Sequence, residues 1–184
     1  VILFFNKVDL YNKKLISQKE KLMREYSKIG YRCMSLSALY DNMNEVKSIV
    51  KNKNNLISGH SGSGKSTLIN KLLGNSNILT KEISQRHDQG QHTTTFSELY
   101  RLDFGGTIID TPGIKGFGLV NIDLDRLSDF FPEFLSLKEG CKFNNCRHIK
   151  EPNCKVKEAL ENDQISKDRY SNYLSMLETE ESIY

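Results

Sequence analysis

The sequence has little of what marks a secreted, membrane-spanning or disordered protein. It contains no tryptophan, three prolines and four cysteines among 184 residues. No apolar run approaches the ~20 residues that a membrane-spanning helix needs, and without a charged-then-apolar leader pattern we do not expect secretion. With 38% hydrophobic and 27% charged residues, the composition predicts a soluble globular protein, which we expect in the cytoplasm.

A strong charge of one sign is also missing. The 26 basic and 23 acidic residues leave a formal net charge of +3, which is too small to predict a nucleic-acid partner by itself. The length suits one full domain with a small appendage. Because the chain opens on the apolar run Val1 to Phe5 without a methionine, we expect a fragment of a longer protein.

Strand-like and helical patterns alternate along the chain. Strands are expected at 1–5, 31–36, 56–58, 98–104 and 107–109, and helices around 15–29, 46–50 and 67–73. The first strand is typical of one buried on both faces of a parallel sheet, and Gly105-Gly106 favours a tight hairpin turn. The alternation predicts an α/β fold, a three-layer α/β/α domain around a mostly parallel sheet, followed by a mostly helical segment.

A phosphate-binding loop is predicted where a short strand runs into a helix. Residues 59–66 match the pattern G-x-x-x-x-G-K-[ST] at every specified position. Main-chain N–H groups and the positive end of the helix would hold the phosphates, Lys65 would reach the β- and γ-phosphates, and Ser66 would bind Mg²⁺. A flexible Gly/Ser loop is the alternative. The residues expected at the nucleotide are Gly59, Ser61, Gly62, Ser63, Gly64, Lys65, Ser66 and Thr67.

Two further segments predict that the base is guanine. The sequence Asn-Lys-Val-Asp follows the first strand and fits N-K-x-D. The Asp9 carboxylate can accept hydrogen bonds from N1–H and the exocyclic amine of guanine, a donor pair that adenine lacks. Asn6 would brace the loop, the Lys7 stem would cover the base, and a main-chain N–H at Ser37-Ala38 would contact the guanine O6. A solvated turn is the alternative for the four-residue pattern.

Two more elements predict how Mg²⁺ and the γ-phosphate are held. The segment from Asp110 to Gly113 fits D-x-x-G, in which the aspartate holds Mg²⁺ through water and the glycine N–H meets the γ-phosphate. The run Thr93-Thr94-Thr95 lies between the phosphate-binding loop and D-x-x-G, and we expect Thr94 and Thr95 to close over the nucleotide, with Thr95 as a Mg²⁺ ligand. The base-reading motifs precede the phosphate-binding loop, so the sequence predicts a circularly permuted GTPase domain. The Asp110 loop then leads directly into the C-terminal segment.

A cysteine-rich stretch predicts a metal site. In a chain without a secretory leader, four cysteines argue against a disulfide framework. Cys141, Cys146, His148 and Cys154 supply three thiolates and an imidazole, the ligand set of a tetrahedral zinc site that is structural because no position stays open. Unmetallated thiols are the alternative. Cys33 lies within a predicted strand and is expected to pack as a small apolar residue.

Basic residues surround these ligands against a single acid, Glu151. Such a density is suited to phosphate contacts, although a solvated basic surface is the alternative. The basic residues are Lys142, Arg147, Lys150, Lys155 and Lys157.

The motifs together closely resemble those of the RsgA (YjeQ) family, the small ribosomal subunit-dependent GTPases of bacteria and organelles. The likeness rests on the permuted order and on residues 90–95, 110–114 and 151–154, and it extends over essentially the whole chain. It implies a GTPase domain at 1–120, N-terminally incomplete, and a helical zinc-binding domain at 121–184. The family's N-terminal OB-fold domain is expected to be absent from this chain.

The resemblance also implies an activity and a partner. A family member binds the small ribosomal subunit and its rRNA late in assembly, and hydrolyses GTP to GDP and phosphate under stimulation by that particle, with Mg²⁺ and structural Zn²⁺. No membrane partner is expected, and we expect a monomer.

The catalytic residues are less evident, because Ile114 stands where Ras-like enzymes place a water-orienting glutamine. Isoleucine cannot hydrogen-bond the water, so intrinsic turnover should be slow. The resemblance points to His92 for this role, with Lys65 and Thr95 completing the catalytic set; an exposed loop histidine is the alternative. A nucleotide-regulated scaffold with negligible hydrolysis is a competing function, whereas Asp9 and its motif disfavour an ATPase or kinase.

Overall fold

The computed structural model describes residues 1–74, 98–110 and 123–181. The chain divides into two compact units. The first, here called the N-terminal unit, consists of Ile2–Glu20 and Cys33–Phe117, and the second, the C-terminal unit, of Lys21–Arg32 and Gly118–Tyr184 together with Val1. The domain boundary expected at residue 120 stays a prediction.

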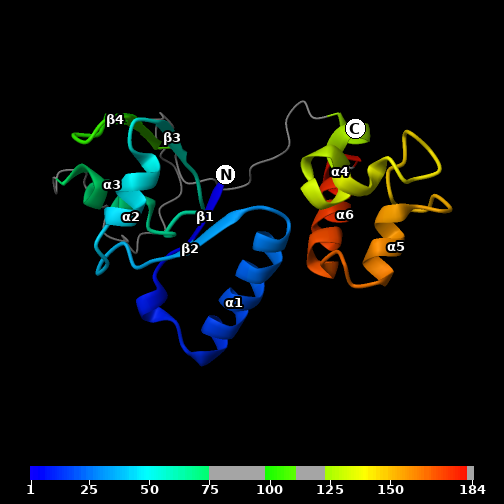
Figure 1. The fold of residues 1–184 in the computed structure, drawn as a ribbon, viewed down its shortest axis with the longest axis horizontal. Helices are drawn as coiled ribbons and strands as arrows, with labels where there is room; N and C mark the ends of the chain where they lie inside the picture. Colours follow the sequence, from blue (N-terminus) through cyan, green and yellow to red (C-terminus); the bar gives the residue numbers. More distant parts are fainter. Residues whose placement is uncertain (75–97, 111–122, 182–184) are drawn as a thin grey trace, which may run out of the picture. The chain divides into compact units, whose positions relative to one another are not determined.

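Two small sheets contain the described strands (Figure 1). One pairs β1 (Ile2–Phe5) with β2 (Arg32–Ser35), and the other has the order β3-β5-β4, formed by Asn54–Ile57, Thr107–Asp110 and Glu98–Arg101. β3 runs parallel to β5, and β4 runs antiparallel to it. The three-stranded sheet is therefore mixed, with one parallel and one antiparallel pair.

The hairpin predicted at Gly105-Gly106 is confirmed. The N–H of Leu102 donates to the carbonyl of Gly106, and the N–H of Gly105 donates back to the carbonyl of Leu102. Both glycines have positive φ values of 91° and 96°, a conformation that residues with a side chain rarely adopt. A Cβ on Gly106 would also lie 2.5 Å from the carbonyl oxygen of Lys53. Glycine is required here for both reasons.

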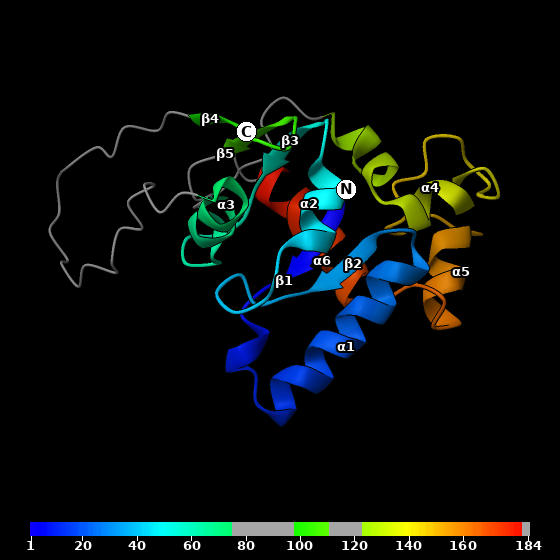
Figure 2. The ribbon, with the colours of Figure 1, turned by 60° about the vertical axis from the view of Figure 1, so that its left-hand side comes forward.

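The three predicted helices of the N-terminal half are present, and the second and third of them contribute to a core. They are α1 (Lys13–Lys28), α2 (Asn44–Val50) and α3 (Lys65–Leu73), with a short 3₁₀ turn η1 at Val8–Leu10. Ile69 of α3 and Ile108 of β5 are fully buried in a cluster that also contains Leu36 and Val46. Figure 2 shows α3 beside the three-stranded sheet, and this packing places the start of α3 at the carboxyl ends of β3 and β5.

The burial expected for the first strand is wrong. All four residues of β1 are only half-buried, and Val1 is 93% exposed. Ile2 and Phe4, which share one face of the strand, pack against the core. Within the described residues β1 pairs only with β2, so it has the environment of an edge strand instead of a central one. The three-layer arrangement stays a prediction.

The C-terminal unit has its own core, to which its described helices contribute. These are η2 (Leu124–Phe130), α4 (Pro132–Lys138), α5 (Lys155–Glu161) and α6 (Lys167–Glu181). Phe134 and Tyr173 are fully buried and meet at 5.1 Å between ring centroids. Arg169 forms a nearly buried ion pair with Glu133 at 2.7 Å. Among the described helices, none has both the length and the apolar character needed to cross a membrane.

Candidate nucleotide and metal sites

The predicted phosphate-binding loop joins β3 to α3. Gly64 directly precedes the helix with φ at 94°, and a Cβ at this position would collide with the side-chain amide of Asn6. The Lys65 ammonium donates to the carbonyls of Gly59 at 2.6 Å and His60 at 3.0 Å. The cation that is expected to reach the phosphates therefore lies over the turn that would hold them.

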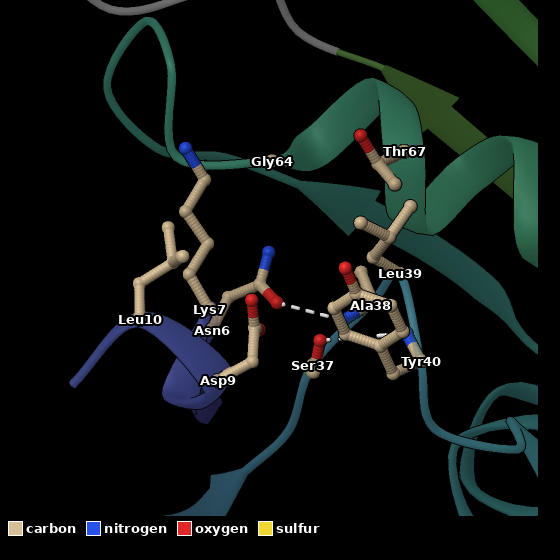
Figure 3. Close-up of a pocket in the computed structure, with 10 residues that line it drawn as sticks. All are labelled: Asn6, Lys7, Asp9, Leu10, Ser37, Ala38, Leu39, Tyr40, Gly64 and Thr67. Carbon is tan, nitrogen blue, oxygen red and sulfur yellow. Dashed lines mark hydrogen bonds between the residues drawn. The ribbon is translucent and has the colours of Figure 1, made fainter.

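One side chain, Asn6, ties the three predicted nucleotide segments together (Figure 3). Its amide nitrogen donates to the carbonyl of Ser63 at 2.9 Å, and its amide oxygen accepts from the N–H of Ala38 at 2.9 Å. Tyr11 supports it by donating its hydroxyl to the Asn6 carbonyl at 3.0 Å. The bracing expected of Asn6 is thus present, and it spans residues that are 57 and 32 positions away.

A cavity of about 210 Å³ opens where these segments meet. Its lining includes seven of the residues expected at the nucleotide: Asn6, Lys7, Asp9, Ser37, Ala38, Gly64 and Thr67. The structure therefore brings the guanine-reading motif, the Ser-Ala segment and the phosphate-binding loop to one place. Their contacts with a nucleotide stay predictions.

The main-chain donors of the Ser-Ala segment already have partners. The N–H of Ser37 donates to a carboxylate oxygen of Asp41 at 2.7 Å, and the N–H of Ala38 donates to Asn6. The contact expected from this pair to the guanine O6 requires one of these bonds to be exchanged for the base, and it stays a prediction.

Three apolar residues of the cavity were missed by sequence reasoning. Leu10, Leu39 and Tyr40 line it while remaining 70%, 59% and 71% exposed. Large side chains of this kind that face water in the wall of a cavity are suited to covering the faces of a flat ring. Their positions in the sequence could have indicated this role, because Leu10 follows Asp9 and the pair Leu39-Tyr40 follows Ala38.

Asp110 lies at the end of β5, and one of its carboxylate oxygens, Oδ1, is buried without a hydrogen-bond donor in the described part of the chain. Burial raises the pKa of this carboxyl group, Lys65 opposes that effect, and Glu98, directly across the strand pair, adds to it. A buried carboxylate oxygen without a partner among the described residues, close to Lys65 of the predicted phosphate-binding loop, fits the chemistry of Mg²⁺, either directly or through water. Ser66, the other described candidate, lies half-buried in the first turn of α3.

The remaining expected nucleotide and catalytic residues lie outside the part of the chain that the structure describes. They are His92, Thr93, Thr94, Thr95, Gly113 and Ile114.

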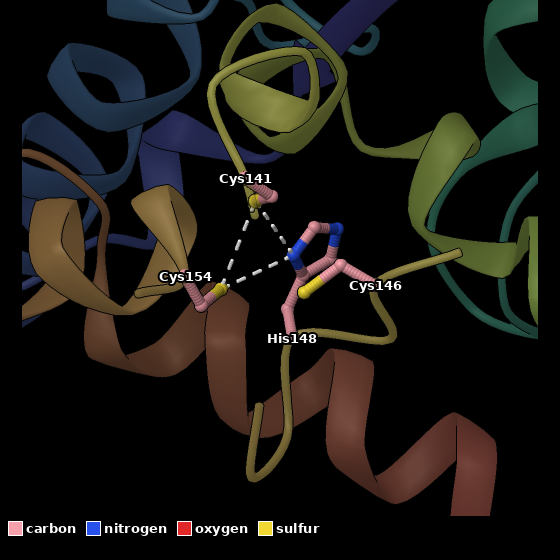
Figure 4. Close-up of side chains that lie close together, drawn as sticks. All are labelled: Cys141, Cys146, His148 and Cys154. Carbon is pink, nitrogen blue, oxygen red and sulfur yellow. Dashed lines mark hydrogen bonds between the residues drawn. The ribbon is translucent and has the colours of Figure 1, made fainter. Parts of the chain in front are cut away.

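The four predicted metal ligands converge in the C-terminal unit (Figure 4). All their ligand atoms lie within 4.8 Å of one another. The His148 Nδ1 is 3.3 Å from the Cys154 sulfur and 3.7 Å from the Cys141 sulfur, and these two sulfurs are 4.0 Å apart. Tetrahedral Zn²⁺ with bonds of about 2.1–2.3 Å separates its ligand atoms by about 3.6–3.8 Å. The cluster therefore has the size of an ion-binding site, and S₃N is a donor set that Zn²⁺ accepts.

Burial makes two of these thiols, those of Cys146 and Cys154, hard to ionise without a cation. It raises the pKa of Cys146 to about 12 and also raises the pKa of Cys154. The imidazole of His148 is fully buried, and burial lowers its pKa, which favours the neutral form that binds metals. A divalent ion would offset the negative charge of the thiolates. Cys33, by contrast, lies half-buried in β2, away from this cluster in sequence.

The basic residues near the cluster are less free than the sequence indicates. Arg147 lies 3.7 Å from Asp125, and Lys155 pairs with Glu158 at 2.6 Å. Lys142 and Lys150 are exposed. Acidic residues from other segments therefore offset part of the positive charge.

Comparison with known proteins identifies relatives along the whole chain. The family model described as RsgA GTPase matches residues 1–120. The small ribosomal subunit biogenesis GTPase RsgA of Flavobacterium psychrophilum is 50% identical over 184 residues, which are 100% of this chain and 56% of that protein. The protein of the same name from Christiangramia forsetii is 47% identical over 100% of this chain and 58% of its own length. The chain thus spans little more than half the length of these curated relatives.

Two solved structures share the fold. The crystal structure of YjeQ from Thermotoga maritima is 34% identical with a TM-score of 0.77, covering 97% of this chain and 59% of that one. The structure of YloQ, described as a circularly permuted GTPase, is 26% identical with a TM-score of 0.78, covering 100% of this chain and 57% of that one.

Proposed function

The chain belongs to the RsgA GTPase family, and on this premise we propose that it binds GTP with Mg²⁺ and hydrolyses it in the maturation of the small ribosomal subunit. The observation that carries the proposal is the shared cavity in which Asn6 joins the guanine-reading and phosphate-binding segments. The names of the relatives, small ribosomal subunit biogenesis GTPases, support the partner.

Guanine would enter the cavity above η1. The exposed Asp9 carboxylate would accept from the base, and the Lys7 stem with Leu39 and Tyr40 would cover its faces. Lys65 would leave the carbonyls of Gly59 and His60 and turn to the β- and γ-phosphates, because a phosphate oxygen is a stronger partner for an ammonium group than a carbonyl. Mg²⁺, held by Ser66, Thr95 and, through water, Asp110, would offset the charge of the phosphates.

Hydrolysis needs a water in line with the γ-phosphate. Ile114 cannot orient it, so we assign this role to His92, with Lys65 and Thr95 stabilising the charge that develops on the γ-phosphate oxygens. Binding to the small subunit would complete this arrangement. Gly113 and Thr94 would contact the γ-phosphate, so their positions would differ between the GTP and GDP states. The segment after Asp110 continues into the C-terminal unit and would transmit that difference.

The C-terminal unit would hold structural Zn²⁺ through Cys141, Cys146, His148 and Cys154, and its basic surface would contact rRNA. The ion would supply charge neutralisation and cross-linking, not chemistry on the substrate. A cytoplasmic location follows from the ribosomal partner, and the monomeric state stays a prediction.

The guanine assignment is tested by Asp9→Asn. An amide presents a donor where the carboxylate accepted, so affinity should shift from GTP to xanthosine triphosphate by at least about tenfold, the value of roughly one hydrogen bond. Binding of both nucleotides to the purified chain measures the shift. Asp103→Asn, an exposed site outside the cavity, is the matched control, and a variant that still selects GTP would refute the assignment.

The hydrolytic assignment is tested by turnover with and without small ribosomal subunits. His92→Ala should keep GTP binding and lose about 100-fold of the stimulated rate, the usual range for a positioned acid–base group. Unchanged hydrolysis in this variant would remove His92 from the mechanism. If the unaltered protein shows no stimulated turnover but co-sediments with the subunits only when GTP is bound, the nucleotide-regulated scaffold is the better description.

A further inference from the structure

The loop that carries two of the metal ligands depends on a single carboxylate. The Glu151 side chain accepts from the N–H of Arg147 and of Ile149, both at 2.8 Å, and from that of Lys150 at 3.0 Å. The N–H of His148, between them, contacts the Cys146 sulfur instead. Residues 147–150 belong to no helix or strand. The contacts with Glu151 therefore replace the main-chain hydrogen bonds that a helix or strand would give these N–H groups.

The carbonyl groups of the same loop are held from the opposite direction. Tyr170 donates its hydroxyl to the carbonyl of His148, and Tyr173 donates to that of Arg147, both at 2.7 Å. Both tyrosines come from α6, and Tyr173 is fully buried. Phe134 of α4 meets the His148 imidazole edge to face at 6.0 Å. His148 is thus held in place through both its main-chain carbonyl and its imidazole ring.

This support acts on a conformation that the chain rarely adopts unaided. His148 has φ at 60° and Asn153 has φ at 56°, both in the left-handed region. A histidine there needs contacts that outweigh the local preference. The left-handed turn lets Cys146 and His148, two residues apart, direct their ligand atoms to one point.

We propose that Glu151 is a positioning residue for the metal ion: it folds the loop 146–151 before the ion binds and presents Cys146 and His148 to Cys141 and Cys154. This inference rests on the proposed zinc site. In the sequence Glu151 is an acid among basic residues, a position that suggests a partner for their charges. In the structure its carboxylate instead accepts from the main-chain N–H groups of Arg147, Ile149 and Lys150. Two carboxylate oxygens can serve three donors, whereas glutamine offers one oxygen and alanine none. A preformed loop binds the ion more tightly because less ordering remains to be done on binding.

The test uses Glu151→Gln and Glu151→Ala in the full chain, with Co²⁺ and Zn²⁺ as probes. Affinity is measured by competition with a chromophoric chelator, and Co²⁺ absorption reports tetrahedral S₃N ligation. We expect affinity to fall 10- to 100-fold in Glu151→Ala, the usual effect of losing a support outside the ligand shell, and less in Glu151→Gln. Tyr170→Phe, which removes one carbonyl contact, should fall between the unaltered protein and Glu151→Ala.

Amide hydrogen exchange of the metal-free protein separates positioning from general stability. Arg147, Ile149 and Lys150 should be protected in the unaltered chain and should exchange faster in Glu151→Gln, while amides of α6 keep their protection. Glu158→Gln is the matched control, because Glu158 lies in the same unit and, in the part of the chain that the structure describes, its carboxylate pairs with the exposed Lys155 and not with the metal loop.

Each outcome decides a different point. Equal Co²⁺ affinity in the Glu151 variants and the control would overturn the positioning role, as would rapid exchange of the three amides in the unaltered metal-free chain. Absence of Co²⁺ and Zn²⁺ binding in the unaltered protein would instead refute the zinc site itself. If Glu151→Ala does not fold even with saturating Zn²⁺, the isosteric Glu151→Gln and Tyr170→Phe carry the decision.

Discussion

The proposed nucleotide cavity and the proposed metal site are assembled in different ways. The cavity collects segments from residues 6–10, 37–40 and 64–67, whereas the metal ligands lie between Cys141 and Cys154. Yet in the cavity one amide, that of Asn6, bonds to both of the other segments, while the compact metal loop is held by a carboxylate, two tyrosines and an aromatic ring. Closeness in sequence does not itself create a ligand geometry.

The two sites also differ in what they need when no ligand is bound. Lys7, Asp9 and the apolar residues of the cavity face water, so their polar groups are solvated. The sulfurs of Cys146 and Cys154 are buried, and their raised pKa values disfavour the thiolates that a metal requires. We therefore expect the cavity to persist without nucleotide and the metal site to depend on its ion for stability.

The largest expected effect breaks the metal site. Cys154→Ser removes a buried ligand that also packs in the core of the C-terminal unit, and the free energy of metal binding, on the order of 10 kcal/mol for structural zinc, would largely be lost. Zinc content should fall to zero and the near-ultraviolet dichroism of Tyr170 and Tyr173 should collapse. Nucleotide affinity, in contrast, should stay within about threefold, because none of the cavity residues contributes to the metal site.

The matched control for that variant is Cys33→Ser, since Cys33 is not among the ligands. Cys33→Ser should keep the metal. Full zinc content and an unchanged melting temperature in Cys154→Ser would show that the metal is not what holds the C-terminal unit together.

A smaller effect is expected from removing the side chain that connects the segments of the cavity. Asn6→Ala leaves the Ala38 N–H and the Ser63 carbonyl without their partner, which costs about 1–3 kcal/mol and should weaken GTP binding about 10- to 100-fold. Zinc content should not change. Binding of a fluorescent GDP analogue measures the loss.

Asn12→Ala is the control, because the Asn12 side chain accepts from the N–H of Leu15 at the start of α1 and does not line the cavity. A GTP affinity within twofold of the unaltered value in Asn6→Ala would mean that the cavity is held together by other contacts.

The smallest expected effect lies in an ion pair outside both sites. Lys138 bonds Asp129 at 2.6 Å, and this bond, helped by Arg126, lowers the pKa of Asp129. A depressed carboxyl pKa means that the pair stabilises the fold above the ordinary pKa of aspartate, and that this contribution is lost only as the pH falls through the lower, folded-state pKa. It should therefore be constant between pH 5.5 and 7.5.

A double-mutant cycle of Asp129→Asn and Lys138→Gln measures this coupling by urea unfolding. We expect about 0.5–1 kcal/mol, the range for a pair that keeps some contact with water. A coupling that changes between pH 5.5 and 7.5 would contradict the direction of the pKa shift.

The sequence by itself determined the local architecture and pointed to the candidate residues that the structure brings together. The strand that runs into the 59–66 loop, the hairpin at Gly105-Gly106 and the set of four metal ligands were all readable. Each depends on spacing within a few residues or on a glycine that the main chain requires, so neighbouring residues are sufficient to predict it. The burial of the first strand could not be predicted in this way, because it depends on which distant segments pack against the strand.

Only the tertiary structure decided how these parts are held. The Asn6 amide meets Ser63 and Ala38, which are distant in the chain, and the hydroxyls of Tyr170 and Tyr173 reach the metal loop from α6. The sequence marks such residues as ordinary polar or aromatic positions, and Glu151 as one acid among lysines. A hydrogen bond between remote segments exists only once packing has brought them within about 3 Å, and no local pattern encodes that approach.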